Sequence, residues 1–306
     1  MARKPRKAVQ YNLETTQACE TLLITLLRAF GDFRDGLRLV GGLVPRYLAP
    51  AAPPEVPPHV GSNDVDVVLD LAMLGAGGVP ADLVARLEAA NFARYQNGQG
   101  GESRWQWERD IDGCWMRVDF LVNTDQPQGF AVVPIGDGGL CASAIPFAAI
   151  ATTWFVERPI TAELPDGGGP ATMTIRHVDA TAFIALKALT LGRREEPKDV
   201  ADLVHVMRYY PGAPDTLADI FAERLRGGLH GAALEAALEQ LANKFCDDER
   251  TDGYLKAGPR GFGTFHDFAN DDDRVLEQRN VSAMVTAFVN RVRRGAARGP
   301  GPGTLA

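Results

Sequence analysis

The sequence predicts an α+β fold, in which a mixed β-sheet flanked by helices is followed by a C-terminal helical domain. Up to about residue 170, segments that alternate like strands are interspersed with segments of helical periodicity. After that point apolar residues recur only at helical spacing. With 306 residues and 45% hydrophobic content, the chain is long enough to build more than one core. We therefore expect domains over residues 1–170 and 171–295, and a disordered Gly/Pro-rich tail over residues 296–306.

The first half begins with a helix over residues 13–30, because five apolar side chains recur there at 3–4 spacing: Leu22, Leu23, Leu26, Leu27 and Phe30. The proline-rich residues 49–58 are expected to form an exposed loop. A hairpin across Asp112-Gly113 is predicted, with its tryptophans (Trp105, Trp107 and Trp115) in the core. The remaining expectations are strands over residues 37–44, 64–71, 103–111, 114–122, 130–135 and 153–160, and a helix over residues 80–92.

Residues 163–172 (ELPDGGGPAT) are expected to form a loop and the domain boundary. The second half then predicts helices over residues 177–194, 197–210, 229–245 and 280–294. The acidic run Asp271–Asp273 is interpreted as a solvated loop.

Several classes of protein are disfavoured. The four cysteines are scattered without a CxxC pair, and the five histidines form no HExxH pair, so neither a zinc site nor a disulfide framework is expected. No apolar run reaches the ~18 residues of a membrane span, and the basic N-terminus leads into no apolar signal segment. We expect a soluble, cytoplasmic protein that does not bind membranes.

The charge distribution is uneven. The formal net charge is −7, yet both ends are basic, and no acidic residue follows Glu277. Basic ends are suited to nucleic acid phosphates, but solvated tails explain them equally well.

Three aspartates carry the functional hypothesis. Asp64 and Asp66 are two residues apart in a predicted strand, so their side chains share one face. Asp119 lies within another apolar strand, where aspartate is uncommon. Carboxylates in such a position need a positive partner, which is either an arginine or lysine or a divalent cation such as Mg²⁺. The alternative is a solvated strand end that caps a neighbouring helix.

Gly41 and Gly42 follow the strand that precedes the Asp64 strand. Glycines there let the backbone approach phosphates closely. Together with the three aspartates, this pattern is typical of a site that holds two metal ions about 4 Å apart and binds a nucleoside triphosphate.

The pattern resembles the nucleotidyltransferase superfamily related to DNA polymerase beta, with GSNDVDVVLDL as its Ser-x-Asp-x-Asp element. The segment FIALKALTLGRREEPKDVADLVHVM further resembles the abortive-infection (AbiEii-like) nucleotidyltransferase toxins of type IV toxin–antitoxin systems. The resemblance covers roughly residues 20–210. It implies a nucleotidyltransferase-type sheet in the first domain, with Asp64, Asp66 and Asp119 as catalytic metal ligands for Mg²⁺ or Mn²⁺.

The same resemblance implies nucleotide-binding roles for Gly41, Gly42, Ser62, Arg46, Lys187, Lys198, Asp199 and Asp202, and a catalytic role for Lys187. The residue after the Gly-Gly pair is Leu43, where family members usually carry Ser or Thr, so Ser62 is the candidate for that hydroxyl. Two structural alternatives stay open. Lys187 could pair with Asp199 or Asp202 as a structural salt bridge, and Asp199 could simply favour a helix N-terminus.

The function expected is metal-dependent transfer of a nucleoside monophosphate from a nucleoside triphosphate to an acceptor hydroxyl. The resemblance implies RNA, such as a tRNA 3′ end, or a protein as acceptor, and a toxin or phage-defence role with a cognate antitoxin. The alternatives are a small-molecule, antibiotic-type nucleotidyltransferase and a non-catalytic scaffold that keeps the same fold.

Overall fold

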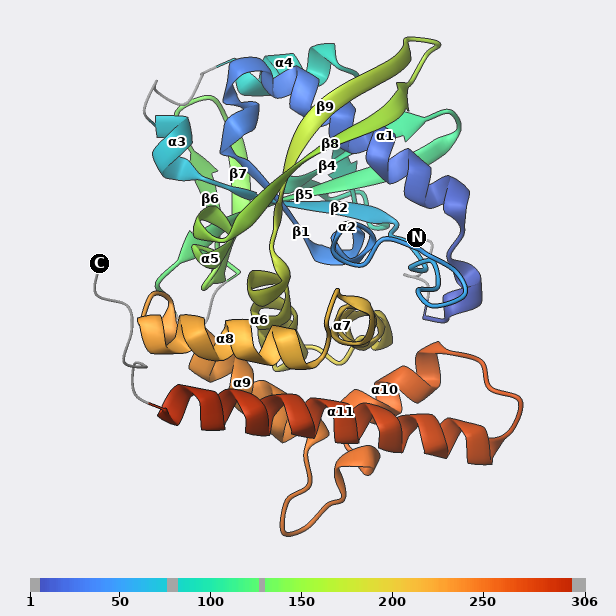
Figure 1. Ribbon diagram of the computed structural model, residues 1–306. Coiled ribbons are helices and arrows are strands. Elements are labelled where there is room, and N and C mark those ends of the chain that lie inside the picture. The colour runs from blue at the N-terminus through green and yellow to red at the C-terminus, as the bar shows by residue number, and fades with distance from the viewer. Residues whose placement is uncertain (1–5, 76–81, 127–129, 299–306) are drawn as a thin grey trace. The chain divides into compact units, whose positions relative to one another are not determined.

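The computed structural model describes residues 6–75, 82–126 and 130–298, and the fold is of the α+β class (Figure 1). The chain divides into two compact units. The described part of the first unit comprises residues 11–44, 60–75, 82–126 and 130–179, and that of the second comprises residues 6–10, 45–59 and 180–298.

The first unit is built on a nine-stranded mixed sheet. Its main path has the order β3-β4-β5-β2-β1-β9-β8, and β7 joins β5 and carries β6. The pairs β1/β9, β2/β5 and β5/β7 are parallel, whereas the remaining pairs are antiparallel. The strands are β1 (Leu37–Val40), β2 (Asp64–Leu69), β3 (Ala93–Gln96), β4 (Glu102–Ile111), β5 (Cys114–Thr124), β6 (Val132–Ile135), β7 (Leu140–Pro146), β8 (Phe155–Leu164) and β9 (Gly169–Val178).

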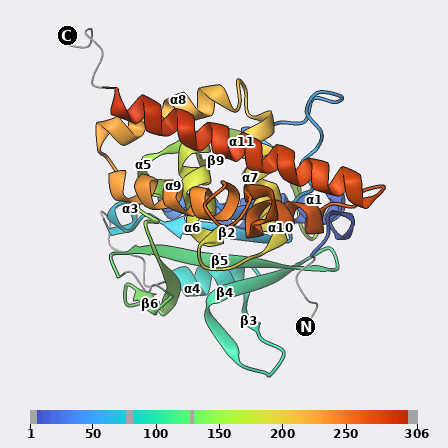
Figure 2. The ribbon, with the colours of Figure 1, turned by 90° about the horizontal axis from the view of Figure 1, so that it is seen from below.

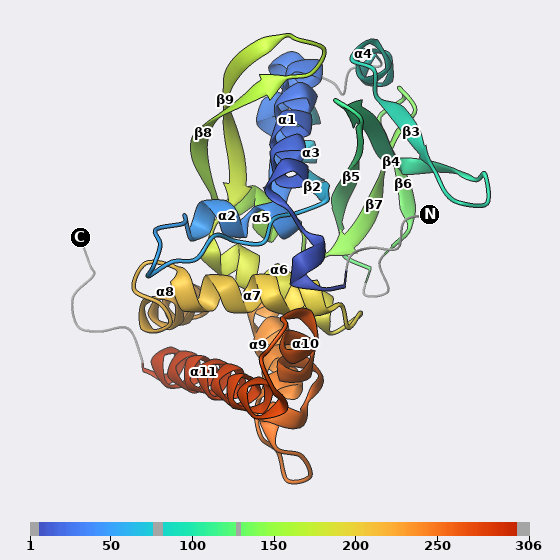
Figure 3. The ribbon, with the colours of Figure 1, turned by 90° about the vertical axis from the view of Figure 1, so that its right-hand side faces the viewer.

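Helix α1 (Leu13–Phe30) covers one face of this sheet, as Figure 3 shows. All five side chains of its predicted apolar stripe are buried. The ring of Phe30 lies 5.8 Å from that of Phe120 on β5, centroid to centroid. Because side chains alternate along a strand, Arg117 and Asp119 on β5 point away from α1. The shorter helices of the first unit are α3 (Leu71–Gly75), α4 (Leu83–Ala89) and α5 (Ile150–Thr153).

The second unit is helical in its described part, apart from an isolated bridge within the proline-rich segment. Its long helix α11 (Asp271–Ala297) lies across α8, α9 and α10 (Figure 2). Phe288 of α11 packs edge-on against Phe221 of α8, with ring centroids 5.6 Å apart. The other helices are α2 (Pro45–Leu48), α6 (Ala180–Leu191), α7 (Pro197–Tyr209), α8 (Asp215–Gly227), α9 (Gly231–Phe245) and α10 (Ala257–Phe265).

The prediction of a loop over residues 163–172 is wrong. Strands β8 and β9 pair along their whole length, from Phe155↔Val178 to Leu164↔Gly169. The Asp-Gly-rich stretch between them forms a tight hairpin turn, with Asp166, Gly167 and Gly169 at positive φ. Glycine suits such a turn as well as it suits a linker. The chain passes from the first unit to the second for the last time between Asp179 and Ala180, beyond the boundary expected from the sequence.

Other expected boundaries also shift. His177 and Val178 belong to β9, so the helix expected from residue 177 begins at Ala180. The acidic run Asp271–Asp273 is no loop but the first turn of α11, where the helix dipole favours acids. Trp107 is buried as expected, whereas Trp115 is 66% exposed.

Two further expectations fall partly outside the described residues. The helix expected over residues 80–92 is seen only as the shorter α4, and residues 80 and 81 are not described. Of the expected tail, residues 296 and 297 continue α11, and residues 299–306 lie outside the described part of the chain. None of the helices in that part combines the length and apolar character needed to cross a bilayer.

Asn270 caps α11, because its side-chain oxygen accepts a hydrogen bond of 2.9 Å from the backbone N–H of Asp273. We expect Asn270→Ala to lower the free energy of unfolding by about 1 kcal/mol, the usual effect of losing such a cap. Urea unfolding followed by circular dichroism measures this effect. Asn280→Ala, an exposed change on the same helix, is the control; equal effects of the two substitutions would contradict the capping role.

Candidate functional site

Four charged side chains form a square on the sheet face that points away from α1. In the parallel pair β2/β5, Asp64 is opposite Arg117 and Asp66 is opposite Asp119. Since residues two apart share a face and paired residues lie side by side, all four side chains project together. The register therefore brings the three predicted aspartates together in one cluster.

Arg117 is the positive partner that the structure supplies to this cluster. Its Nε donates to Oδ1 of Asp119 at 2.7 Å, and its Nη2 donates to Oδ2 of Asp64 at 2.9 Å. Burial alone would lower the pKa of Arg117, but the charges of Asp119, Asp64 and Asp66 outweigh it and raise that pKa. Arginine was one of the two kinds of partner considered from the sequence, and Arg117 lies among these carboxylates.

Asp66 lies against the glycine turn. Val40, the last residue of β1, is paired with Asp66, so Gly41 comes directly beside its carboxylate. A Cβ atom at position 41 would lie 2.0 Å from Oδ2 of Asp66, and Gly41 adopts a φ of +77°. Both the close approach and the left-handed backbone require glycine here. The predicted Gly-Gly turn thus borders the carboxylate cluster.

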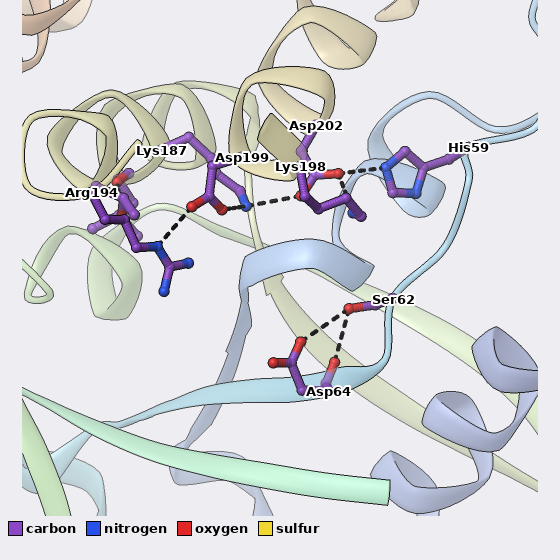
Figure 4. Close-up of polar contacts among 10 residues, drawn as sticks. His59, Ser62, Asp64, Lys187, Arg194, Lys198, Asp199 and Asp202 are labelled. Atoms are coloured by element: carbon purple, nitrogen blue, oxygen red, sulfur yellow. Dashed lines mark hydrogen bonds and ion pairs between the residues drawn. The ribbon is translucent and has the colours of Figure 1, made fainter. Parts of the chain in front are cut away.

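Ser62 and Gln106 fix the orientation of the outer two carboxylates. The hydroxyl of Ser62 donates to the backbone oxygen of Asp64 at 3.0 Å and lies 3.3 Å from its Oδ1 (Figure 4). The amide of Gln106 on β4 lies 3.2 Å from both oxygens of Asp119. The Cys19 thiol of α1 donates to the Ser62 carbonyl oxygen at 3.3 Å, which anchors the segment before β2.

The donor set of the cluster consists of hard carboxylate oxygens, which suit Mg²⁺ or Mn²⁺ in kind. As the side chains stand, however, no three His, Cys, Asp or Glu residues in the described ranges are grouped closely enough to hold a metal ion. Arg117 bridges two of the three carboxylates instead.

A second charged network lies within the second unit (Figure 4). The ammonium of Lys187 on α6 donates to Asp199 at 2.7 Å and to Asp202 at 2.9 Å, both on α7. Asp202 also accepts from Lys198, and it contacts Nε2 of His59 at 2.8 Å. Asp199 accepts a further bond of 2.8 Å from Arg194. The structural salt bridge considered for Lys187 is therefore present.

Burial and pairing shift the pKa values in this network. Burial would raise the pKa of Asp202, but Lys187 and Lys198 outweigh it and hold that pKa far below its usual range. Burial would likewise lower the pKa of Lys187, yet Asp199 and Asp202 raise it. For His59, burial and the nearby Lys198 lower the pKa to about 4. Burial also lowers the pKa of His205 to about 4, and no hydrogen-bond partner is seen for its buried Nε2.

The predicted site residues therefore form two groups, each within its own unit. The first group holds Gly41, Gly42, Ser62, Asp64, Asp66 and Asp119, and the second holds Lys187, Lys198, Asp199 and Asp202. Arg46 lies in α2 of the second unit and is partly exposed. Sequence reasoning missed Arg117, Gln106 and His59. Arg117 was detectable, since it precedes Asp119 by two residues in the same predicted strand.

Comparison with known proteins finds no protein-family model that matches the chain and no curated protein with significant similarity to it. The family resemblance therefore rests on the motifs alone, and function has to be argued from the geometry of the two groups.

The histidines of the second unit make its stability depend on pH. Because the pKa of His59 is about 4 in the folded protein and 6.5 ordinarily, the unfolded chain binds the extra proton first as the pH falls. We expect the free energy of unfolding to decrease between pH 6.5 and pH 4, by up to about 3 kcal/mol for this histidine.

Urea unfolding at several pH values measures this loss in the wild type and in His59→Gln, whose amide can still donate to Asp202. The His59→Gln profile should be flatter over the same interval. His230→Asn, which changes a half-buried histidine outside the network, is the control; burial lowers the pKa of His230 as well, so its profile should flatten less than that of His59→Gln. Parallel profiles for the wild type and His59→Gln would contradict the assignment.

Proposed function

We propose that the protein is a metal-dependent nucleotidyltransferase that moves a nucleoside monophosphate from a nucleoside triphosphate to an acceptor hydroxyl. The observation that carries this proposal is the register of β2 and β5, which places Asp64, Asp66 and Asp119 together on one face. The glycine turn beside Asp66 adds a backbone position that phosphates can approach closely.

The proposed cofactor is Mg²⁺ or Mn²⁺, and Asp64, Asp66 and Asp119 are the residues that would hold it. When bound, such an ion neutralises the charge that builds on the phosphate oxygens and the leaving group. The three carboxylates fit it in number and chemistry, provided that Arg117 leaves its present position between Asp64 and Asp119.

The chain's own groups account for positioning and proton transfer. The acceptor hydroxyl oxygen forms a bond to the α-phosphorus, the bond between that phosphorus and the bridging oxygen breaks, and pyrophosphate leaves. Asp119 receives the hydroxyl proton in this scheme. Gln106 restrains the Asp119 carboxylate by contacting both of its oxygens, and Ser62 restrains Asp64. The backbone at Gly41 and Gly42 faces the triphosphate.

The roles of Arg46, Lys187, Lys198, Asp199 and Asp202 in binding the nucleotide stay predictions. Lys187 is 7% exposed and already bonded to two carboxylates, so it would have to exchange one of them for a phosphate. The network accounts for its own charges without a ligand, and its contribution to stability is the simpler explanation of Lys187, Lys198, Asp199 and Asp202.

The acceptor is proposed from the resemblance to abortive-infection nucleotidyltransferase toxins. On that basis it is RNA, such as a tRNA 3′ end, or a protein, and the biological role is that of a toxin or phage-defence enzyme with a cognate antitoxin. A small-molecule acceptor of the antibiotic type is the enzymatic alternative. Salt-dependent binding of RNA separates the two, because phosphate contacts release counterions.

A non-catalytic scaffold is the second candidate, and Arg117 is the observation that favours it. The guanidinium offsets part of the charge of the three carboxylates, and a cluster held in this way can persist without any metal ion. The two candidates differ in whether divalent cations and nucleotides bind at all.

The first test measures transfer. The protein is incubated with each nucleoside triphosphate labelled at the α-phosphate, with Mg²⁺ and with total cellular RNA and protein. We expect label to enter a macromolecule and Asp66→Asn to reduce the rate by at least about a hundredfold, since it removes a carboxylate that the transition state needs. Glu102→Gln, an exposed acid on the same sheet, is the matched control and should leave the rate unchanged. Equal rates in the wild type and Asp66→Asn would reject the assigned site.

The second test separates enzyme from scaffold. Binding to the folded state alone stabilises it, by about 2.7 kcal/mol at a ligand concentration a hundred times Kd. We expect Mg²⁺ together with the preferred nucleoside triphosphate to raise the Tm by several degrees, and Asp64→Asn to abolish the shift. If no nucleotide with Mg²⁺ changes the Tm of the wild type, the scaffold is the better description.

A further inference from the structure

Arg117 stands where the proposed site needs a cation. Its guanidinium is hydrogen-bonded to Asp64 and Asp119, and its charge also interacts with Asp66. Arginine stays protonated at every pH that a folded protein tolerates, so this positive charge is permanent. A divalent ion and the guanidinium therefore compete for the same carboxylate oxygens.

A second acidic partner for the Arg117 guanidinium lies nearby on the same sheet. Glu108 on β4 is paired with Arg117 across the β4/β5 ladder, and the two charges already interact. The guanidinium carbon of Arg117 already lies 5.4 Å from the ring centroid of Tyr95 on β3, so a cation–π contact supports the side chain beside Glu108 as well. The side chain of Arg117 is 22% exposed, so neighbouring atoms do not enclose it.

We propose that Arg117 is a built-in competitor for the metal: it holds Asp64 and Asp119 in the metal-free protein and turns toward Glu108, keeping its contact with Tyr95, when a divalent ion binds. This inference rests on the proposed function, because it concerns the same carboxylates. It adds a residue that sets the metal affinity and restricts the metal-loaded state to conditions in which the ion outcompetes the arginine.

Two physical consequences follow. First, metal binding must break two charge-assisted hydrogen bonds before new bonds form, so the affinity of the wild type is lower than that of the carboxylates alone. Second, removing the guanidinium leaves three carboxylates that repel one another, so an Arg117 variant should be less stable without metal and gain more stability from it.

The test titrates MnCl2 alone into the full-length protein and follows free Mn²⁺ by electron paramagnetic resonance. We expect Arg117→Gln to bind Mn²⁺ about tenfold more tightly than the wild type or better, within the usual range of such couplings. Adding Asp119→Asn to either background should abolish this binding. The Mn²⁺-induced rise in Tm should also be larger for Arg117→Gln than for the wild type.

Arg176→Gln is the matched control. Arg176 on β9 likewise bridges two carboxylates of the first unit, those of Asp35 and Glu157, but it does not contact the cluster. The Mn²⁺ affinity of the Arg176→Gln variant should equal that of the wild type. If Arg117→Gln fails to fold, Arg117→Lys serves instead: one ammonium cannot reproduce the two-pronged guanidinium contact, so its affinity should exceed that of the wild type.

Glu108→Gln tests whether Glu108 binds the displaced guanidinium, because this substitution keeps the shape of the side chain and removes its charge. A displaced guanidinium then lacks its partner, and Mn²⁺ binding should weaken by up to about fivefold. Equal or tighter binding by this variant would overturn the proposed destination of the arginine.

Failure of this inference and failure of the proposed function give different results. If the wild type and Arg117→Gln bind Mn²⁺ equally and both lose it with Asp119→Asn, the metal site stands and the competition is refuted. If neither binds Mn²⁺ and neither is stabilised by it, the competition and the metal site are both refuted.

Discussion

Carboxylates that share one face of a β-sheet repel one another at about the spacing between strands, and a positive charge must lie among them for the strands to pair. The register of β2 and β5 imposes this constraint, because it places Asp64 beside Arg117 and Asp66 beside Asp119. Arg117 meets it with a fork-shaped group whose nitrogens reach two carboxylates at once. The parallel pairing of β2 and β5 and the charge balance of the cluster therefore both depend on Arg117.

Charge neutralisation follows the same logic in the second unit. Asp202 is completely buried, and it is tolerated there because Lys187, Lys198 and His59 surround it. Removing one member of such a buried network leaves an uncompensated buried charge. This typically lowers the free energy of unfolding by about 3–5 kcal/mol. The network joins α6, α7 and the segment that ends at His59. Apart from His59, the residues of this network lie in the segment that resembles the toxin motif. Their presence there is consistent with a structural role as well as with the predicted nucleotide contact.

The two interpretations of the cluster in the first unit are a catalytic site and a scaffold held by the arginine. They differ in what the carboxylates bind and not in how they are placed. An arginine that saturated all the oxygens would favour the scaffold. Arg117 instead bonds one oxygen of Asp64 and one of Asp119, while its side chain retains access to solvent. Arg117 has a second partner nearby in Glu108, so both interpretations can hold for the same cluster. The arginine stabilises the cluster without a metal ion, and it can leave the carboxylates when an ion binds.

Much of the fold could be predicted from local patterns. The helix over Leu13–Phe30, the strand that begins at Asp64 and the hairpin across Asp112-Gly113 depend on periodicity and turn chemistry, which the sequence carries directly. The stretch over residues 163–172 could not be assigned correctly, since glycine and proline mark a hairpin turn and a linker alike. The first turn of α11 was misassigned because a run of three acids is polar in either setting, and only the cap at Asn270 distinguishes the two.

The sequence by itself determined that Asp64 and Asp66 share a face, that Asp119 lies in a strand, and that such acids require a cation wherever they are buried. These conclusions follow from the two-residue repeat of a strand and from the free energy of burying charge. Only the tertiary structure decided which strands are neighbours, and hence that Asp119 lies beside Asp66 and that Arg117 is the cation. Strand pairing joins residues more than 50 positions apart, and its register depends on the packing of the whole sheet, which no local pattern in the chain encodes.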